Sequence, residues 1–140
     1  MNVSVPVQVE LRIPRSCEFV RVARKTAAAL AHQLAFTIHD VADIELAVSE
    51  ACTNAVEHVR GEECHEILLR FAVEPERLVM EVVDSGPGFD PSQTPDADLG
   101  EEGVGGLGLL VIRAVVDELD IESDAEVGTR VRMVKYRRKQ

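Results

Sequence analysis

The chain has 140 residues, of which 46% are apolar, 15 are basic and 25 are acidic, giving a formal net charge of −10. This length and apolar content predict one globular domain over residues 1–140 and exclude a disordered chain. The acidic balance argues against direct nucleic-acid binding, which needs clustered basic side chains, and no apolar run approaches the roughly 20 residues of a membrane span. We therefore expect a cytoplasmic protein that binds neither nucleic acid nor membrane.

Cysteine and histidine residues do not indicate a metal or disulfide framework. The chain has three cysteines, Cys17, Cys52 and Cys64. Because this number is odd and no CxxC spacing occurs, reduced thiols are expected. A zinc site from Cys52, Cys64, His58 and His65 is disfavoured. If Cys64 and His65 open a strand, their neighbouring side chains point to opposite faces.

The N-terminal part predicts a strand followed by a helix. Every odd position from 3 to 13 is apolar, which is the period of a strand with one buried face. Pro6 cannot donate a ladder hydrogen bond, so this strand should begin at a sheet edge. Apolar residues recur every three or four positions over residues 17–36, which predicts an amphipathic helix with Ser16 as its N-cap.

A second helix is predicted over residues 40–59, with Asp40 as a candidate cap. Its apolar positions gather on one side, and Glu50 and Asn54 lie one turn apart on the other. A carboxylate can accept a proton from a hydroxyl, and an amide oxygen is a neutral ligand that Mg²⁺ accepts. Such a pair is more often a solvated helix face, so by itself it does not establish a site.

Two β-rich runs, 66–73 and 77–84, are separated by Glu-Pro-Glu, which predicts an antiparallel hairpin. Asp84 ends the second run and is followed by Gly86 and Gly88. Glycine lets the backbone turn sharply or approach a ligand closely. For a single DxGxG sequence, however, an ordinary turn is the more common interpretation.

Residues 90–105 lack an apolar period and are acid-rich, which predicts a loop long enough to act as a lid or binding loop. Gly106 and Gly108 then stand at the start of a mostly apolar helix predicted over about residues 107–119. Glycine at the mouth of a helix exposes backbone N–H groups at the positive end of the dipole, where anions bind. Strands near 120–123 and 129–136 close the chain.

This order of elements and motifs resembles the ATP-binding fold shared by DNA gyrase, MutL and the sensor histidine kinases, called the GHKL or Bergerat fold. Within that fold the chain resembles the small bacterial anti-sigma-factor serine kinases of the RsbW and SpoIIAB type. The stretch AVSEACTNAVEHV resembles their N box, VVDSGPGFDP their first glycine box and EGVGGLGLLVIRAVVDEL their second. The resemblance implies an α+β fold: a two-layer sandwich whose mixed, mainly antiparallel sheet is covered on one face by helices.

The resemblance also implies ATP and Mg²⁺ as ligands and assigns roles to residues. Glu50 would match the general base that takes the proton of the attacking hydroxyl, and Asn54 the Mg²⁺ ligand. Asp84 would match the acid that accepts a hydrogen bond from the adenine amino group. Gly86 and Gly88 would give the ring room to enter.

The remaining matches lie in the second half of the chain. Gly106, Leu107 and Gly108 would place backbone amides against the phosphates. Thr129 would match the hydroxyl that supports the adenine through Asp84 or a water molecule.

As a function, the resemblance implies an anti-sigma factor and serine/threonine kinase that binds a sigma factor and phosphorylates a STAS-type anti-anti-sigma partner, working as a homodimer. Alternatives are a nucleotide-binding partner-switching module without kinase activity, the detached catalytic domain of a sensor histidine kinase, or a pure ATPase. Glu50 favours the kinase. The absence of any Lys or Arg between Arg77 and Arg113 favours the binding module, because relatives often carry a basic residue near the lid.

Overall fold

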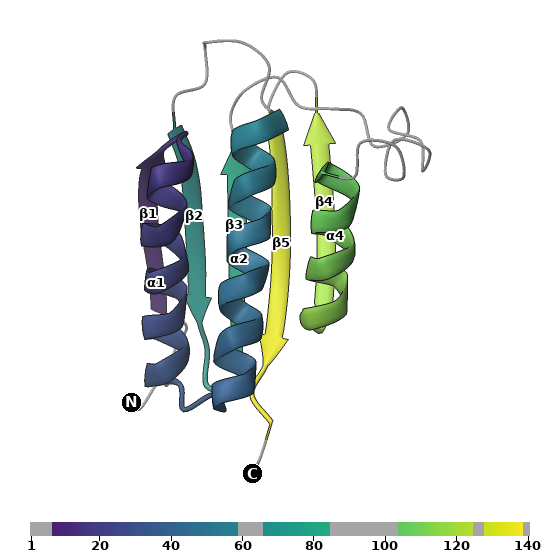
Figure 1. Cartoon of the computed structure of the whole chain (residues 1–140). Coiled ribbons are helices and arrows are strands. Elements are labelled where there is room, and N and C mark those ends of the chain that lie inside the picture. Colours follow the sequence, from purple (N-terminus) through teal and green to yellow (C-terminus); the bar gives the residue numbers. More distant parts are fainter. Residues whose placement is uncertain (1–6, 59–65, 85–103, 125–127, 139–140) are drawn as a thin grey trace.

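A computed structural model of the protein describes residues 7–58, 66–84, 104–124 and 128–138. Figure 1 shows two layers, with the strands in one sheet and the helices side by side across one of its faces. This arrangement confirms the expected α+β sandwich. The described elements are, in order, β1 (Val7–Pro14), α1 (Cys17–Gln33), α2 (Ile38–His58), β2 (Glu66–Val73), β3 (Arg77–Asp84), α4 (Val104–Val115), β4 (Glu118–Asp124) and β5 (Gly128–Tyr136).

The sheet has the strand order β1-β2-β3-β5-β4, and every pair of neighbouring described strands is antiparallel, so the sheet is antiparallel throughout rather than mixed as expected. The first strand lies at an edge, as the sequence predicted, although Pro6 itself is outside the described residues. The central strand β3 pairs with β5 rather than with β4, the next strand along the chain. This crossover places Asp84, the last residue of β3, opposite Thr129 near the start of β5.

The core lies between the sheet and the helices. On β2 and β3, alternate residues face the helices and are almost fully buried, including Phe71 and Met80. The helix α2 supplies the opposite surface, where Ile44 and Val48 have no exposed area. Burying one such side chain contributes about 1.5–3 kcal/mol, so this interface holds the two layers together. Among the described residues, no helix is long and apolar enough to cross a membrane.

The ends of the first two helices differ from the prediction. The first ends before residue 36, because Ala35 adopts a left-handed φ of 60° that stops the helix. Ser16 does occupy the N-cap position of α1, without a side-chain cap hydrogen bond. Asp40 as the cap of α2 was wrong: Thr37 Oγ1 accepts a hydrogen bond from Asp40 N at 3.1 Å, so the helix begins earlier. Asp40 instead lies in the first turn and is buried.

The helix predicted over residues 107–119 is displaced in the structure. It spans Val104–Val115, and the chain from Glu118 onward forms β4 instead. The apolar spacing of Val115, Val116 and Leu119 fits a helix, but Leu119 and Ile121 also alternate with acidic residues in the period of a strand. Pairing with β5 satisfies the backbone of this segment, and the strand therefore forms.

Candidate functional site

Four elements bring those predicted site residues that the structure describes toward one end of the molecule. The strand β3 and the helix α2 run toward the end drawn at the top of Figure 1, and α4 and β5 start from it. Asn54 lies one turn before the end of α2, and Asp84 is the last residue of β3. Gly108 and Thr129 lie near the starts of α4 and β5. Residues far apart in the sequence therefore gather at this end.

The polar side of α2 is covered by α4. A methyl group at Gly108 would lie 3.0 Å from Asn54 Oδ1, 3.0 Å from Glu50 Oε2 and 3.1 Å from Asn54 Nδ2. Only a residue without a side chain allows so close an approach. Glu50 and Asn54 are accordingly half-buried, and this side of the helix is a contact surface rather than a solvated face.

The side-chain oxygen of Asn54 has the properties of a metal ligand. It is buried, and no group among the described residues donates a hydrogen bond to it. Leaving such an acceptor unsatisfied costs about 1–3 kcal/mol, which a bound cation or donor would remove. An amide oxygen is a hard, neutral ligand that Mg²⁺ accepts beside water and phosphate oxygens, so Asn54 could supply one ligand to that ion.

A row of polar side chains crosses three strands at the same end of the sheet. Asp84 is only 6% exposed and continues the helix-facing positions of β3. Its register partner on β5 is Thr129, whose own partner on β4 is Ser123. The hydroxyl oxygens of Ser123 and Thr129 are 3.1 Å apart and hydrogen bonded. A carboxylate and two hydroxyls in one row can bind the polar edge of a planar ring.

Ser123 was not predicted as part of the site. The only structural signal for Ser123 is the register of the last two strands, in which it pairs with Thr129. Nothing in the residue type alone distinguishes it from a solvated serine. It therefore adds a third strand to the row that the sequence analysis drew from Asp84 and Thr129.

The predicted glycines take different positions. Gly86 and Gly88 lie outside the described residues. Gly106 lies in the first turn of α4, where backbone N–H groups have no partner within the helix, and Leu107 is 59% exposed. Gly108 lies further inside, because the helix begins three residues before its predicted start. At this position Gly108 makes the close contact with α2.

The cysteines of the described chain are free thiols. Cys52 is completely buried in the core, and this burial raises the pKa of its thiol to about 12. At neutral pH the thiol is therefore protonated and serves as an apolar packing group. Two further members of the disfavoured zinc group, Cys64 and His65, lie outside the described residues, and His58 is the last residue of α2.

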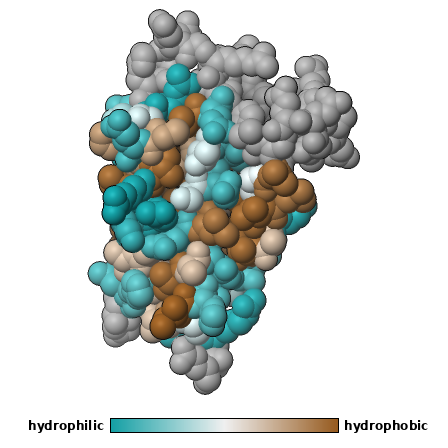
Figure 2. All heavy atoms as spheres, in the orientation of Figure 1, coloured by the Kyte–Doolittle hydropathy of each residue, from teal (hydrophilic) through white to brown (hydrophobic). Residues whose placement is uncertain are grey.

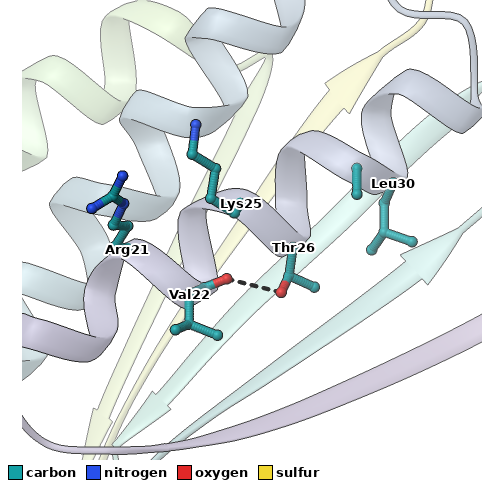
Figure 3. A pocket seen from close by; sticks show the side chains of 6 residues that line it. Arg21, Val22, Lys25, Thr26 and Leu30 are labelled. Carbon is teal, nitrogen blue, oxygen red and sulfur yellow. Dashed lines mark hydrogen bonds between the residues drawn. The ribbon is translucent and has the colours of Figure 1, made fainter.

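A shallow groove lies on α1, and α2 separates this helix from α4 (Figure 1). In Figure 3 its arginine and lysine side chains extend to one side of α1, and Thr26 donates a hydrogen bond to the backbone oxygen of Val22. The groove contains no carboxylate, amide or glycine, so it offers none of the groups assembled at the end of the sheet. It is lined by Arg21, Val22, Lys25, Thr26, Ala29 and Leu30.

Comparisons with known proteins give one consistent result. A family model described as the histidine kinase-like ATPase domain matches residues 13–135. The serine-protein kinase RsbW of Bacillus velezensis is 36% identical over 137 residues, covering 91% of this chain and 84% of the relative. The protein of the same name from Bacillus subtilis strain 168 is 34% identical over 137 residues, with the same coverage of both chains.

Solved structures agree on the fold. The RsbU and RsbW domains of Rv1364c from Mycobacterium tuberculosis superpose with a TM-score of 0.69 at 20% identity, covering 95% of this chain and 33% of that chain. The histidine kinase domain of the Erythrobacter litoralis EL346 blue-light activated histidine kinase gives 0.54 at 23% identity, covering 88% and 61%. At these identities the likeness bears on architecture alone.

Proposed function

The chain belongs to the histidine kinase-like ATPase domain family, and on this basis we propose that it is an ATP-dependent protein serine/threonine kinase that also acts as an anti-sigma factor. The relatives named serine-protein kinase RsbW support the kinase activity. The observation that carries the proposal is the contact of Gly108 with Glu50 and Asn54, which joins the two motifs that the chemistry requires.

The proposed site has two halves. Asp84 and Thr129, with Ser123 beside them, form the adenine half, and Gly86 and Gly88 give the ring room to enter. Gly106, Leu107 and Gly108 form the phosphate half together with Asn54. The buried, unsatisfied Oδ1 of Asn54 would hold Mg²⁺, which would neutralise charge on the phosphates.

Glu50 is proposed as the general base of the transfer. As the serine oxygen bonds to the γ-phosphorus, the bond from that phosphorus to ADP breaks, and the Glu50 carboxylate takes the hydroxyl proton. Its half-buried position beside Asn54 supports this role, because it holds the carboxylate next to the proposed phosphate half.

The proposed partners follow from the motif resemblance. They are a sigma factor, which the protein binds, and a STAS-type anti-anti-sigma protein, which it phosphorylates. We further propose that the 140 residues act as a single domain in a cytoplasmic homodimer.

A binding module without phosphate transfer is the second candidate function, favoured by the lack of Lys and Arg between Arg77 and Arg113. Incubation with radiolabelled ATP and an anti-anti-sigma protein separates the two, because only the kinase transfers the label.

Asp84 should select adenine over guanine. The adenine amino group donates a hydrogen bond where guanine offers a carbonyl oxygen, and two acceptors that face each other in a buried site disfavour binding. Wild-type protein should therefore prefer ATP to GTP by at least about tenfold in a displacement titration. Asp84→Asn, which can donate to guanine, should narrow this ratio, and Asp120→Asn on the exposed part of β4 should not. Equal competition by GTP in the wild type would remove Asp84 from the adenine half.

Gly108→Ala should weaken Mg-ATP binding about tenfold in calorimetric titration. The added methyl group, 3.0 Å from Asn54 Oδ1, would displace the amide, which has a short side chain and little freedom to move. Leu110→Ala, at a 56% exposed position of the same helix, is the matched control and should retain wild-type affinity. An unchanged affinity in Gly108→Ala would show that the close contact is not needed for binding.

A further inference from the structure

Lys135 is a charged residue in the core, at the end of the helical layer opposite to the proposed nucleotide site. It is only 4% exposed and continues the helix-facing positions of β5 after Val131 and Met133. Its Nζ atom donates a hydrogen bond to the backbone oxygen of Val115 at 2.7 Å. The same atom lies 3.3 Å from Asp43 Oδ2.

A third partner completes the cluster. Asp40 Oδ1 is 3.6 Å from Lys135 Nζ, and both side chains are at least nine-tenths buried. A buried ammonium group is tolerated when it is paired and its three protons find acceptors. Here the acceptors come from the first turns of α2 and the last residue of α4, so one side chain of the sheet ties both helices together.

The bond to Val115 is specific to the end of a helix. The last carbonyl groups of a helix have no partner within it, and the negative end of the dipole favours a cation. Val115 is the final residue of α4, so Lys135 satisfies a carbonyl that the helix leaves free. The position of this end of α4 is thereby fixed relative to α2 and β5.

The other end of the same two helices carries the phosphate half of the proposed site. Gly108 lies about 10 Å from Val115 along α4, at about 1.5 Å per residue. Gly108 is the residue that contacts Asn54 and Glu50 of α2. A helix fixed at one end and packed on its neighbour transmits that placement along its length. A misplacement of about 1 Å caused by a remote substitution can lower the rate of a catalysed reaction about a hundredfold, so the groups at the far end of α4 depend on this placement.

We propose that Lys135 is a positioning residue for the phosphate and metal half of the nucleotide site, which it serves by fixing α4 against α2 through Val115, Asp40 and Asp43. The inference rests on the proposed function, because it assigns a role within that site. It acts on one half only. Asp84 and Thr129 lie on β3 and β5, whose relative position is set by the hydrogen bonds of the sheet.

The test compares Mg-ATP, which would occupy both halves of the proposed site, with adenosine, which would occupy only the adenine half. Lys135→Met should weaken Mg-ATP binding about tenfold in calorimetric titration, while adenosine affinity, followed by NMR titration, should stay within about twofold of wild type. A general loss of folding would lower both affinities together. Lys25→Met is the matched control, since Lys25 also pairs with an acid of α2, Glu45, at 3.8 Å, but is 62% exposed at the side chain. It should leave both affinities unchanged.

Asp43→Asn provides a second, milder variant, because the Asp43 side chain is 38% exposed and the bond from Lys135 to Val115 remains. It should weaken Mg-ATP binding by a smaller factor, again without loss for adenosine. If Lys135→Met does not fold, the Asp43→Asn affinities alone test the role of Lys135. Equal losses of affinity for both ligands, or no loss of affinity for Mg-ATP, would overturn the role of Lys135. The proposed function would remain intact in that case, provided that the wild-type protein binds Mg-ATP. Failure of the wild type to bind either ligand would instead overturn the proposed function.

Discussion

Glu50→Gln should lower the rate of phosphate transfer at saturating ATP by about a hundredfold or more. A base that takes the serine proton is needed in the transition state and hardly in the ground state, so ATP affinity and sigma-factor binding should remain close to wild type. Glutamine has nearly the same size as glutamate, which preserves the contact with Gly108. The measurement is the initial rate of partner phosphorylation, with binding determined on the same preparation.

Glu57→Gln is the matched control, because Glu57 is an exposed carboxylate two turns further along the same helix. It should transfer phosphate at the wild-type rate. If Glu50→Gln also does so, Glu50 is not the base, although the kinase proposal survives. Loss of ATP affinity in Glu50→Gln would indicate that the carboxylate shapes the site rather than serving the chemistry.

Asn54→Ala should weaken Mg-ATP binding at least tenfold, about 1.4 kcal/mol. The substitution removes the buried Oδ1 atom, which accepts no hydrogen bond from the described residues and would leave Mg²⁺ one ligand short. Calorimetric titration should be carried out both in Mg²⁺ and in a chelator. In the chelator, the variant and the wild type should bind ATP with similar affinity.

Asn54→Asp tests the same point from the opposite direction, because it keeps an oxygen ligand at this position. It should recover Mg²⁺-dependent binding that the alanine variant loses. If Asn54→Ala weakens binding equally with and without Mg²⁺, the amide supports the helix contact and is not the metal ligand.

Local patterns were sufficient to predict most of the fold. The β-rich runs over residues 66–73 and 77–84, separated by Glu-Pro-Glu, predicted β2 and β3 with the bounds that the structure shows. The segment after residue 115 was assigned wrongly, because its apolar spacing fits both a helix and a strand. Pairing with β5 decided between them, and this is a contact between chain segments that no local pattern contains.

The sequence predicted which residues belong to the candidate site, but it did not predict how they contact one another. The motifs identified Glu50, Asn54, Asp84 and Gly108, whose roles stay predictions. The approach of Gly108 to the amide of Asn54 depends on how two helices pack, and that is not encoded in either helix alone. The burial of Lys135 could be predicted from its place among the inward-facing positions of β5. Its partners could not, because the acids that pair with it lie over 90 residues earlier in the chain.

Figure 2 shows apolar side chains gathered over the exposed side of α4, where Leu107 and Leu110 are more than half exposed. Contiguous apolar patches on a protein surface often mark sites that contact other proteins. For the proposed kinase, such a surface beside the phosphate half is compatible with binding of a protein substrate. Phosphorylation of a protein acceptor is therefore the activity that would distinguish the proposed kinase from a nucleotide-binding module.

Transfer of label from γ-radiolabelled ATP to a STAS-type anti-anti-sigma protein, followed by acid treatment, tests the proposed activity most directly. The proposal predicts Mg²⁺-dependent labelling of the partner that survives acid, because a phosphate ester of serine or threonine is acid-stable. Binding of ATP without any labelling would contradict it and identify a binding module. Labelling that acid removes would also contradict it, since a phosphohistidine is acid-labile and indicates histidine kinase chemistry.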